Sequence, residues 1–134
     1  MKKMTETKQN PIPLHQSELD ALADQIREVA RAELMPRFSR VRRAEKQDGS
    51  FVTEADFLVQ KNLSAWLSKQ WPGIGFLGEE MESSKQRALL DSDNPIWCLD
   101  PLDGTTNFVS DIPYFCISLA LVARGKVRLA IVYD

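Results

Sequence analysis

A short apolar run that ends in an acidic turn constrains this chain more than any other feature of its sequence. Residues 96–99 read Ile-Trp-Cys-Leu, an uninterrupted apolar run typical of a buried strand. Asp100-Pro101 should end that strand, because proline fixes its own backbone and has no N–H to donate. A turn at Asp103-Gly104 follows, and then Thr105-Thr106-Asn107, where hydroxyl and free N–H groups suit the start of a helix. The sequence therefore predicts a strand, an acidic turn and a helix start in immediate succession.

Two kinds of chemistry meet in this turn. The carboxylates of Asp100 and Asp103 can bind a hard cation, and the N–H groups at the start of a helix can bind a phosphate. A purely structural interpretation also exists, since Asp-Pro and Asp-Gly are common turn dipeptides and Asp is a common helix cap. The combination of both devices in one turn nevertheless makes metal-assisted phosphoryl transfer the functional hypothesis.

Composition and charge narrow the class of protein. A chain of 134 residues with 43% apolar residues suits one ordinary domain. Its 17 basic and 19 acidic residues give a net charge of -2, so we expect no nucleic-acid partner. We also expect no membrane association, since no apolar run is long enough for a span and the start lacks a signal-peptide core. Cys98 and Cys116 lie in apolar runs, which favours buried free thiols and a cytoplasmic location.

The first half of the chain predicts two helices. Residues 1–16 are expected to form a loose tail, and apolar residues recur at helical spacing from Ser17 onward. Pro36 should kink or end this helix near Met35. A second helix is expected to start at Thr53, acting as its N-cap. We interpret the basic residues between the two helices as a solvated helix end: Arg37, Arg40, Arg42, Arg43 and Lys46.

The second half predicts strands. Apolar runs at residues 74–77, 96–99 and 115–123 are followed by a strand from Val127 to Tyr133 with one partly covered face, carrying Val127, Leu129, Ile131 and Tyr133. Residues 81–94 are polar and suggest a loop around a short helix. Helices followed by strands predict an α+β fold with helices layered on a mainly antiparallel sheet. Because the sequence stops within a strand pattern, we expect the N-terminal part of a longer domain, spanning residues 17–134.

The pattern Trp-x-x-Asp-Pro-x-Asp-Gly-Thr-x-Asn-Phe at residues 97–108 resembles the signature of the inositol monophosphatase family of magnesium-dependent, lithium-sensitive sugar-phosphate phosphatases. Every fixed position of that signature is present. A Val-Thr-x-x-Asp element at residues 52–56 and Gly-Glu-Glu at residues 78–80 match two further elements of the family. The resemblance implies the layered αβαβα fold of these sugar phosphatases, of which this chain would hold the N-terminal portion.

The resemblance implies a Mg²⁺ site with oxygen ligands. Glu79, Asp100 and the backbone carbonyl of Leu102 would bind a first ion, and Asp100 and Asp103 a second, so that Asp100 bridges. Glu80 would act in catalysis either by supporting these ligands from outside the metal's coordination or as a ligand of a third metal. Adjacent acids on a loop are more often a solvated surface feature, so the assignment of Glu79 and Glu80 depends on the resemblance.

The resemblance also implies the groups that act on water and phosphate. Asp56 and Thr105 would orient the attacking water, and the N–H groups of Gly104, Thr105 and Thr106 would hold the phosphate oxygens. From the residues alone, Asp56 is equally well explained as the third-position acid of a capping box with Thr53.

These assignments predict hydrolysis of a small phosphate monoester, inositol monophosphate or a related compound, by a metal-activated water. The sequence pattern of residues 46–56 also resembles that of histidinol-phosphate phosphatases and of phosphatases of 3'-phosphoadenosine 5'-phosphate. A non-catalytic binding protein of the transcription machinery is a further alternative. An inactive fragment is another, because the family's second-half element, Trp-Asp-x-Ala, is missing here. The resemblance implies a homodimer for the complete protein.

Overall fold

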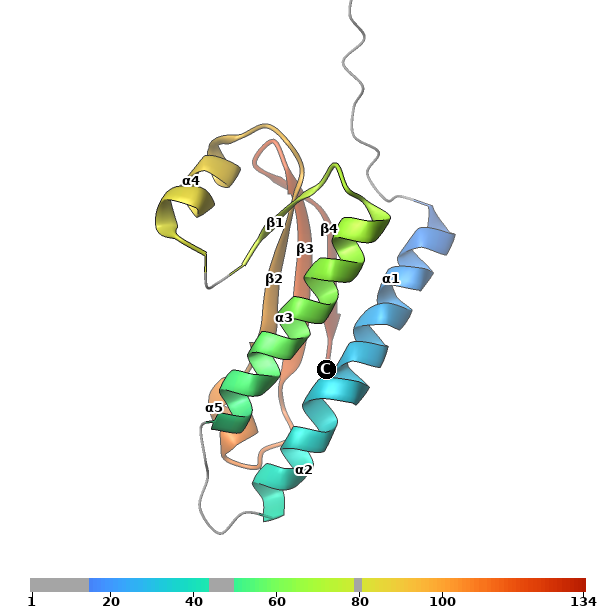
Figure 1. The fold of residues 1–134 in the computed structure, drawn as a ribbon. Coiled ribbons are helices and arrows are strands. Elements are labelled where there is room, and N and C mark those ends of the chain that lie inside the picture. Colours follow the sequence, from blue (N-terminus) through green and yellow to red (C-terminus); the bar gives the residue numbers. More distant parts are fainter. Residues whose placement is uncertain (1–14, 44–49, 79–80) are drawn as a thin grey trace, which may run out of the picture.

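Two helical rods lie side by side against one face of a four-stranded sheet (Figure 1). This computed structural model describes residues 15–43, 50–78 and 81–134. Helices on one side of a mixed, mainly antiparallel sheet confirm the predicted α+β class. Within the described ranges, no helix combines the length and the apolar character needed to cross a bilayer.

The first rod is a continuous helical segment that runs past Pro36. It consists of α1 (Gln16–Val29), the π-helical turn η1 (Ala30–Leu34) and α2 (Met35–Arg43). Of the two outcomes expected at Pro36, a kink or an end, the end near Met35 is wrong. The Met35 N–H bonds to the Ala30 carbonyl, five residues back, so the hydrogen-bond register changes just before the proline. A proline at the start of a new α-helical register lacks only an N–H that is dispensable there.

The second rod is α3 (Ser50–Gln70). The prediction of Thr53 as its N-cap is wrong, because no Gly or Pro separates Ser50 from Thr53 and the helix already begins at Ser50. The side chain of Thr53 lies outside the described residues. Asp56 therefore falls in the second turn, too far along to be a capping-box acid. One stripe of α3 is fully buried against the first rod and the sheet, at the expected four-residue spacing: Ala55, Val59, Leu63 and Leu67.

The sheet has the order β1-β2-β3-β4, with β1 parallel to β2 and the other pairs antiparallel. Its strands are β1 (Gly75–Leu77), β2 (Ile96–Asp103), β3 (Cys116–Ala123) and β4 (Lys126–Tyr133). The crossover between the parallel strands carries the short helix α4 (Ser83–Asp91), which confirms the helix predicted within residues 81–94.

The two faces of the sheet differ in composition. In β3, every second residue from Ile117 to Ala123 is buried beneath the rods. The alternating residues from Cys116 to Val122 are only half-buried on the opposite face, which we call the open face. The open face of β3 carries Cys116, Ser118, Ala120 and Val122. It is thus lined by small and moderately polar side chains, whereas the helix-covered face is made of large apolar ones.

β4 departs from the expected alternation at its first residues. Leu129, Ile131 and Tyr133 are half-buried as predicted, but Val127 is 64% exposed. The pairing shifts by one residue between Leu121↔Leu129 and Val122↔Val127, so β4 contains a bulge. Because a residue inserted in one strand reverses the facing of those beyond it, Val127 lies on the open face beside Val122.

Candidate active site

β2 carries the acidic turn beyond the proline instead of stopping at it. The strand continues to Asp103, so the predicted end at Asp100-Pro101 is wrong. Asp100 pairs with Ser118 and Asp103 with Cys116. Three residues along β2 thus lie opposite two residues along β3, so β2 contains a bulge of one extra residue. Pro101 falls in this bulge, where a residue without an N–H removes no ladder hydrogen bond. Since Ser118 and Cys116 both lie on the open face, the carboxylates of Asp100 and Asp103 share that face.

Local hydrogen bonding fixes the bulge. The Leu102 N–H donates to Oδ1 of Asp100 over 3.3 Å, an Asx-type turn across the proline. The pKa of Asp100 is raised, mainly because its carboxyl is partly desolvated. The Leu102 hydrogen bond acts in the opposite direction, and the charge of Asp103 raises the pKa further. The charge of Asp103 disfavours the ionised form of Asp100, and a bound divalent cation would offset this. The two carboxylates therefore offer the oxygen donors that a hard cation prefers.

One of the two thiols, Cys116, lies in the negative potential of these carboxylates. Both cysteines are free, as predicted, but they are half-buried on the open face and not fully buried as expected. Burial raises the pKa of Cys98. The pKa of Cys116 is raised by burial first, and then by the charges of Asp103, Asp100 and Asp134. Three carboxylates thus act on one point of the open face, so the potential there is negative and would attract a cation.

Two hollows border the carboxylates on the open face. One of about 400 Å³ lies beside Asp100, and its lining includes Gly78, Gln86 and Ser118. The other, of about 370 Å³, lies beside Asp103 and is bordered by Tyr114. Each carboxylate is therefore accessible from a space large enough for a small solute.

Gly104 makes the sharp exit from β2 into α5 (Thr105–Val109). Its φ of 92° is in the left-handed region, and a Cβ there would lie 2.9 Å from the Tyr114 carbonyl oxygen. The Phe108 N–H donates to the Gly104 carbonyl and closes the first turn. Thr105 and Thr106 are exposed at this helix start, where the first N–H groups have no partner within the helix. The expected helix start is confirmed.

An aromatic cluster holds α5 in place. Phe108 is fully buried, and its ring centroid lies 5.5 Å from that of Phe38 on α2 and 5.0 Å from that of Phe115. The rings of Phe38 and Phe115 are also in contact, at 5.0 Å. Because aromatic contacts of this kind add to the burial energy, the turn before α5 rests on a rigid base.

Asp56 lies on α3, which packs against β2 and α5. Asp56 is half-buried. One turn later, Gln60 packs against Gly78 at the end of β1, since a Cβ on Gly78 would lie 2.9 Å from Gln60 Nε2. Gln86 also fixes Gly78 by donating to its carbonyl over 3.0 Å.

The predicted site is thus only partly brought together in the described residues. Asp100, Leu102 and Asp103 share one bulge, and Gly104, Thr105 and Thr106 follow it directly. Glu79 and Glu80 lie outside the described residues, so their roles stay predictions. Within the described ranges, no three His, Cys, Asp or Glu side chains gather closely enough to hold a metal.

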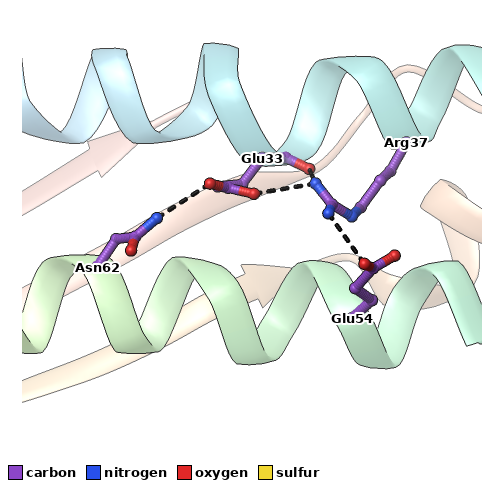
Figure 2. Close-up of polar contacts among 4 residues, drawn as sticks. All are labelled: Glu33, Arg37, Glu54 and Asn62. Atoms are coloured by element: carbon purple, nitrogen blue, oxygen red, sulfur yellow. Dashed lines mark hydrogen bonds and ion pairs between the residues drawn. The ribbon is translucent and has the colours of Figure 1, made fainter.

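The prediction that Arg37 belongs to a solvated helix end is wrong. Its side chain is not solvated, because only 13% is exposed and the guanidinium bonds to Glu33 and Glu54 (Figure 2). Of the other basic residues, Arg40 is exposed as predicted, and the side chains of Arg42, Arg43 and Lys46 lie outside the described residues. The signal in the sequence was Glu33, four residues before Arg37, a spacing that favours an ion pair on one helix face.

A family model described as the inositol monophosphatase family matches residues 15–134. The chain belongs to this family. Inositol monophosphatase 1 of Bos taurus is 36% identical over 113 residues, which are 84% of this chain and 40% of that protein. A Nus factor, SuhB of Pseudomonas aeruginosa, is 37% identical over 93 residues, 67% of this chain and 32% of that protein.

Solved structures agree with the family. The Thermotoga maritima IMPase matches with a TM-score of 0.66 and 31% identity, covering 87% of this chain and 44% of that one. An IMPase/NADP phosphatase solved with NADP and Ca²⁺ matches with a TM-score of 0.65 and 25% identity, covering 88% and 42%. The fold is that of the inositol monophosphatases. The chain spans between 32% and 44% of the length of these relatives.

Proposed function

We propose that this chain belongs to a Mg²⁺-dependent phosphatase that hydrolyses a small phosphate monoester with water as the nucleophile. The observation that carries the proposal is the β2 bulge, which directs Asp100 and Asp103 to one open, negatively charged face beside a helix start. Membership of a family that includes inositol monophosphatases supports the reaction class.

The cation would be held by oxygen ligands of this chain. Asp100, Asp103 and the Leu102 carbonyl would be ligands, and Glu79 would add a third carboxylate. When bound, a divalent cation lowers the pKa of a coordinated water and offsets the charge of the phosphate. The family structure solved with NADP and Ca²⁺ supports both a divalent cation and a phosphorylated ligand for such a fold.

The remaining residues would act on water and phosphate directly. The Thr105 hydroxyl would accept a hydrogen bond from the attacking water and donate one to Asp56, which orients the water toward phosphorus. Asp56 lies too far along α3 to be a capping-box acid, so that interpretation does not apply to it. The N–H groups of Gly104, Thr105 and Thr106 would donate to the phosphate oxygens, where charge increases in the transition state.

A phosphorylated enzyme intermediate is not part of the proposal. The sequence has a single histidine, His15, and it stands at the start of α1. A side-chain nucleophile needs an adjacent base to activate it. The acidic site offers ligands and water-orienting groups, which suits direct attack by water.

A second candidate is a role in transcription without catalysis. The observation that favours it is the similarity to a Nus factor, at 37% identity. In that case the open face would serve as a binding surface, and the carboxylates would not support turnover.

A phosphatase assay separates the two candidates. The protein, at the length that its gene encodes, is incubated with Mg²⁺ and inositol monophosphate, histidinol phosphate or 3'-phosphoadenosine 5'-phosphate. Phosphate release that is lost in Asp103→Asn and retained in Asp93→Asn, an exposed acid before β2, is the expected result. Absence of release with every substrate would overturn the phosphatase and favour the transcription role.

A further inference from the structure

Arg37 joins the two helical rods through two carboxylates (Figure 2). Its Nη1 donates to the Glu33 carbonyl over 2.9 Å and to Glu33 Oε2 over 3.0 Å, both within the first rod. Its Nη2 lies 3.2 Å from Oε1 of Glu54, on α3. The guanidinium therefore spans the interface between the rods, near the beginning of α3.

Glu33 makes a second attachment to α3. Its other oxygen, Oε1, accepts a hydrogen bond of 3.0 Å from Asn62 Nδ2. Glu54 and Asn62 are about 12 Å apart along the helix axis, at a rise of about 1.5 Å per residue. Two attachments at different heights oppose both sliding and rotation of α3 against the first rod. We call these four residues, Glu33, Arg37, Glu54 and Asn62, the interhelical clamp.

Glu54 and Asp56 lie on opposite flanks of α3. The buried stripe that includes Ala55 runs between them. Glu54 precedes Ala55 and bonds to the first rod. Asp56 follows Ala55, and Gln60, one turn beyond Asp56, packs against Gly78 of the sheet. A rotation of α3 that released Glu54 would therefore move Asp56 relative to β2.

Stability alone does not explain the clamp. Arg37 Nε is buried and has no hydrogen-bond partner among the described residues. The pair with Glu33 is largely buried, whereas the Glu54 side chain is 51% exposed. A buried pair with an unpartnered N–H is often no more stable than apolar side chains of similar volume, and a solvent-exposed pair contributes little. What an Arg provides beyond such residues is a fixed geometry, because its planar fork can bind two acceptors at once.

We propose that Arg37 is a positioning residue for the reaction: through the interhelical clamp it fixes α3 about its axis and so holds Asp56 at the active site. This inference rests on the proposed function, in which Asp56 orients the attacking water. A displacement of a reacting group by about 1 Å can cost up to about a hundredfold in rate, so a small rotation is sufficient.

The test is a double-mutant cycle between Arg37 and Asp56 in the protein at the length its gene encodes. We expect Arg37→Met to lower kcat about tenfold and leave KM and the Mg²⁺ half-saturation within about twofold, because only the orientation of water changes. In an Asp56→Asn background, Arg37→Met should cause no further loss. Arg31→Met is the matched control, since it removes an exposed 3.6 Å ion pair with Glu28 on the same rod.

Three results decide the matter. The inference is overturned if Arg37→Met lowers kcat by the same factor in the Asp56→Asn background, or if it leaves kcat unchanged in the wild type. If Arg37→Met does not fold, Asn62→Leu, which removes the second attachment, should show the same dependence on Asp56.

Amide hydrogen exchange of residues 54–60 is a readout that needs no activity: faster exchange in Arg37→Met than in Arg31→Met is expected. Unchanged exchange overturns the inference even if the proposed function fails.

Discussion

Asp100 and Asp103 are three residues apart in the sequence and lie on the same face of the sheet. In a regular strand, residues separated by an odd number point to opposite faces. The bulge at Pro101 and Leu102 adds one residue to β2, so both carboxylates reach the open face while Leu99 stays beneath the helices. A bulge thus converts a sequence spacing that would separate two ligands into one that brings them together.

Magnesium binding tests this pair directly. We expect Asp103→Asn and Glu79→Gln each to weaken Mg²⁺ binding at least about tenfold, because each removes a charged ligand. Loss of a ligand should lower the affinity more than loss of a hydrogen bond to a ligand does. Titration calorimetry measures the affinity, with Asp93→Asn as the control for a general loss of negative charge. Equal affinities in all three variants would contradict the ligand assignment.

The sequence predicted the regular parts of this arrangement from periodicity. The α3 stripe and the apolar strands repeat with the helical or strand period, so their positions follow from the residues alone. The bulges in β2 and β4 could not be predicted, since each depends on which residue of β3 is the pairing partner. Pro36 was misjudged because a π-turn just before it changes the hydrogen-bond register of the helix. For Arg37, the sequence offered Glu33 at the ion-pair spacing, but Glu54, its partner across the interface, is distant in the sequence and could not be inferred.

Gly104 should be required for the turn, and the chain offers its own control. In Gly104→Ala, the methyl group meets the Tyr114 carbonyl at 2.9 Å and the backbone keeps a φ of 92°. Gly125 has a φ of 70° with nothing within 4 Å, so Gly125→Ala introduces only the backbone strain. We expect Gly104→Ala to be the more destabilising by about 1–3 kcal/mol in urea unfolding. Equal losses would show that the clash is relieved.

Thr105→Ala should reduce turnover and leave substrate binding nearly intact. The hydroxyl is proposed to act on the attacking water, whereas backbone N–H groups hold the phosphate. Loss of such a group should lower kcat by about a hundredfold, with KM little changed. Steady-state kinetics beside Ser110→Ala, an exposed hydroxyl at the end of α5, provides the comparison. A raised KM with unaltered kcat would instead assign Thr105 to ground-state binding.

Acid should loosen the interhelical clamp. The hydrogen bond from Arg37, followed by its charge, lowers the pKa of Glu54 below the usual carboxyl value. A carboxyl with a lowered folded-state pKa contributes stability that is present above its unfolded pKa and is lost as the pH falls through the folded value. The wild type should therefore lose more stability in acid than Glu54→Gln does. The measurement is the urea unfolding midpoint across the acidic pH range, with Glu28→Gln as the exposed control. If the prediction is wrong, the midpoints of the wild type and of Glu54→Gln will fall in parallel.

Residues 1–134, expressed alone, should self-associate through the sheet. In the described sheet, β4 pairs only with β3, so its outer edge leaves backbone N–H and C=O groups available to another strand. Val127 and Val132 are 64% and 65% exposed on the open face, which adds apolar area beside that edge.

A charge on the open face should weaken this association. Val132→Lys places an ammonium where two sheets would meet, and burying it there is costly. Leu90→Lys is the matched control, because Leu90 is similarly exposed, at 58%, but lies on α4. Size-exclusion chromatography over a range of concentrations should show large species for the unmodified chain and for Leu90→Lys, and smaller ones for Val132→Lys. A monodisperse unmodified chain would mean that the edge and the open face are protected within these residues.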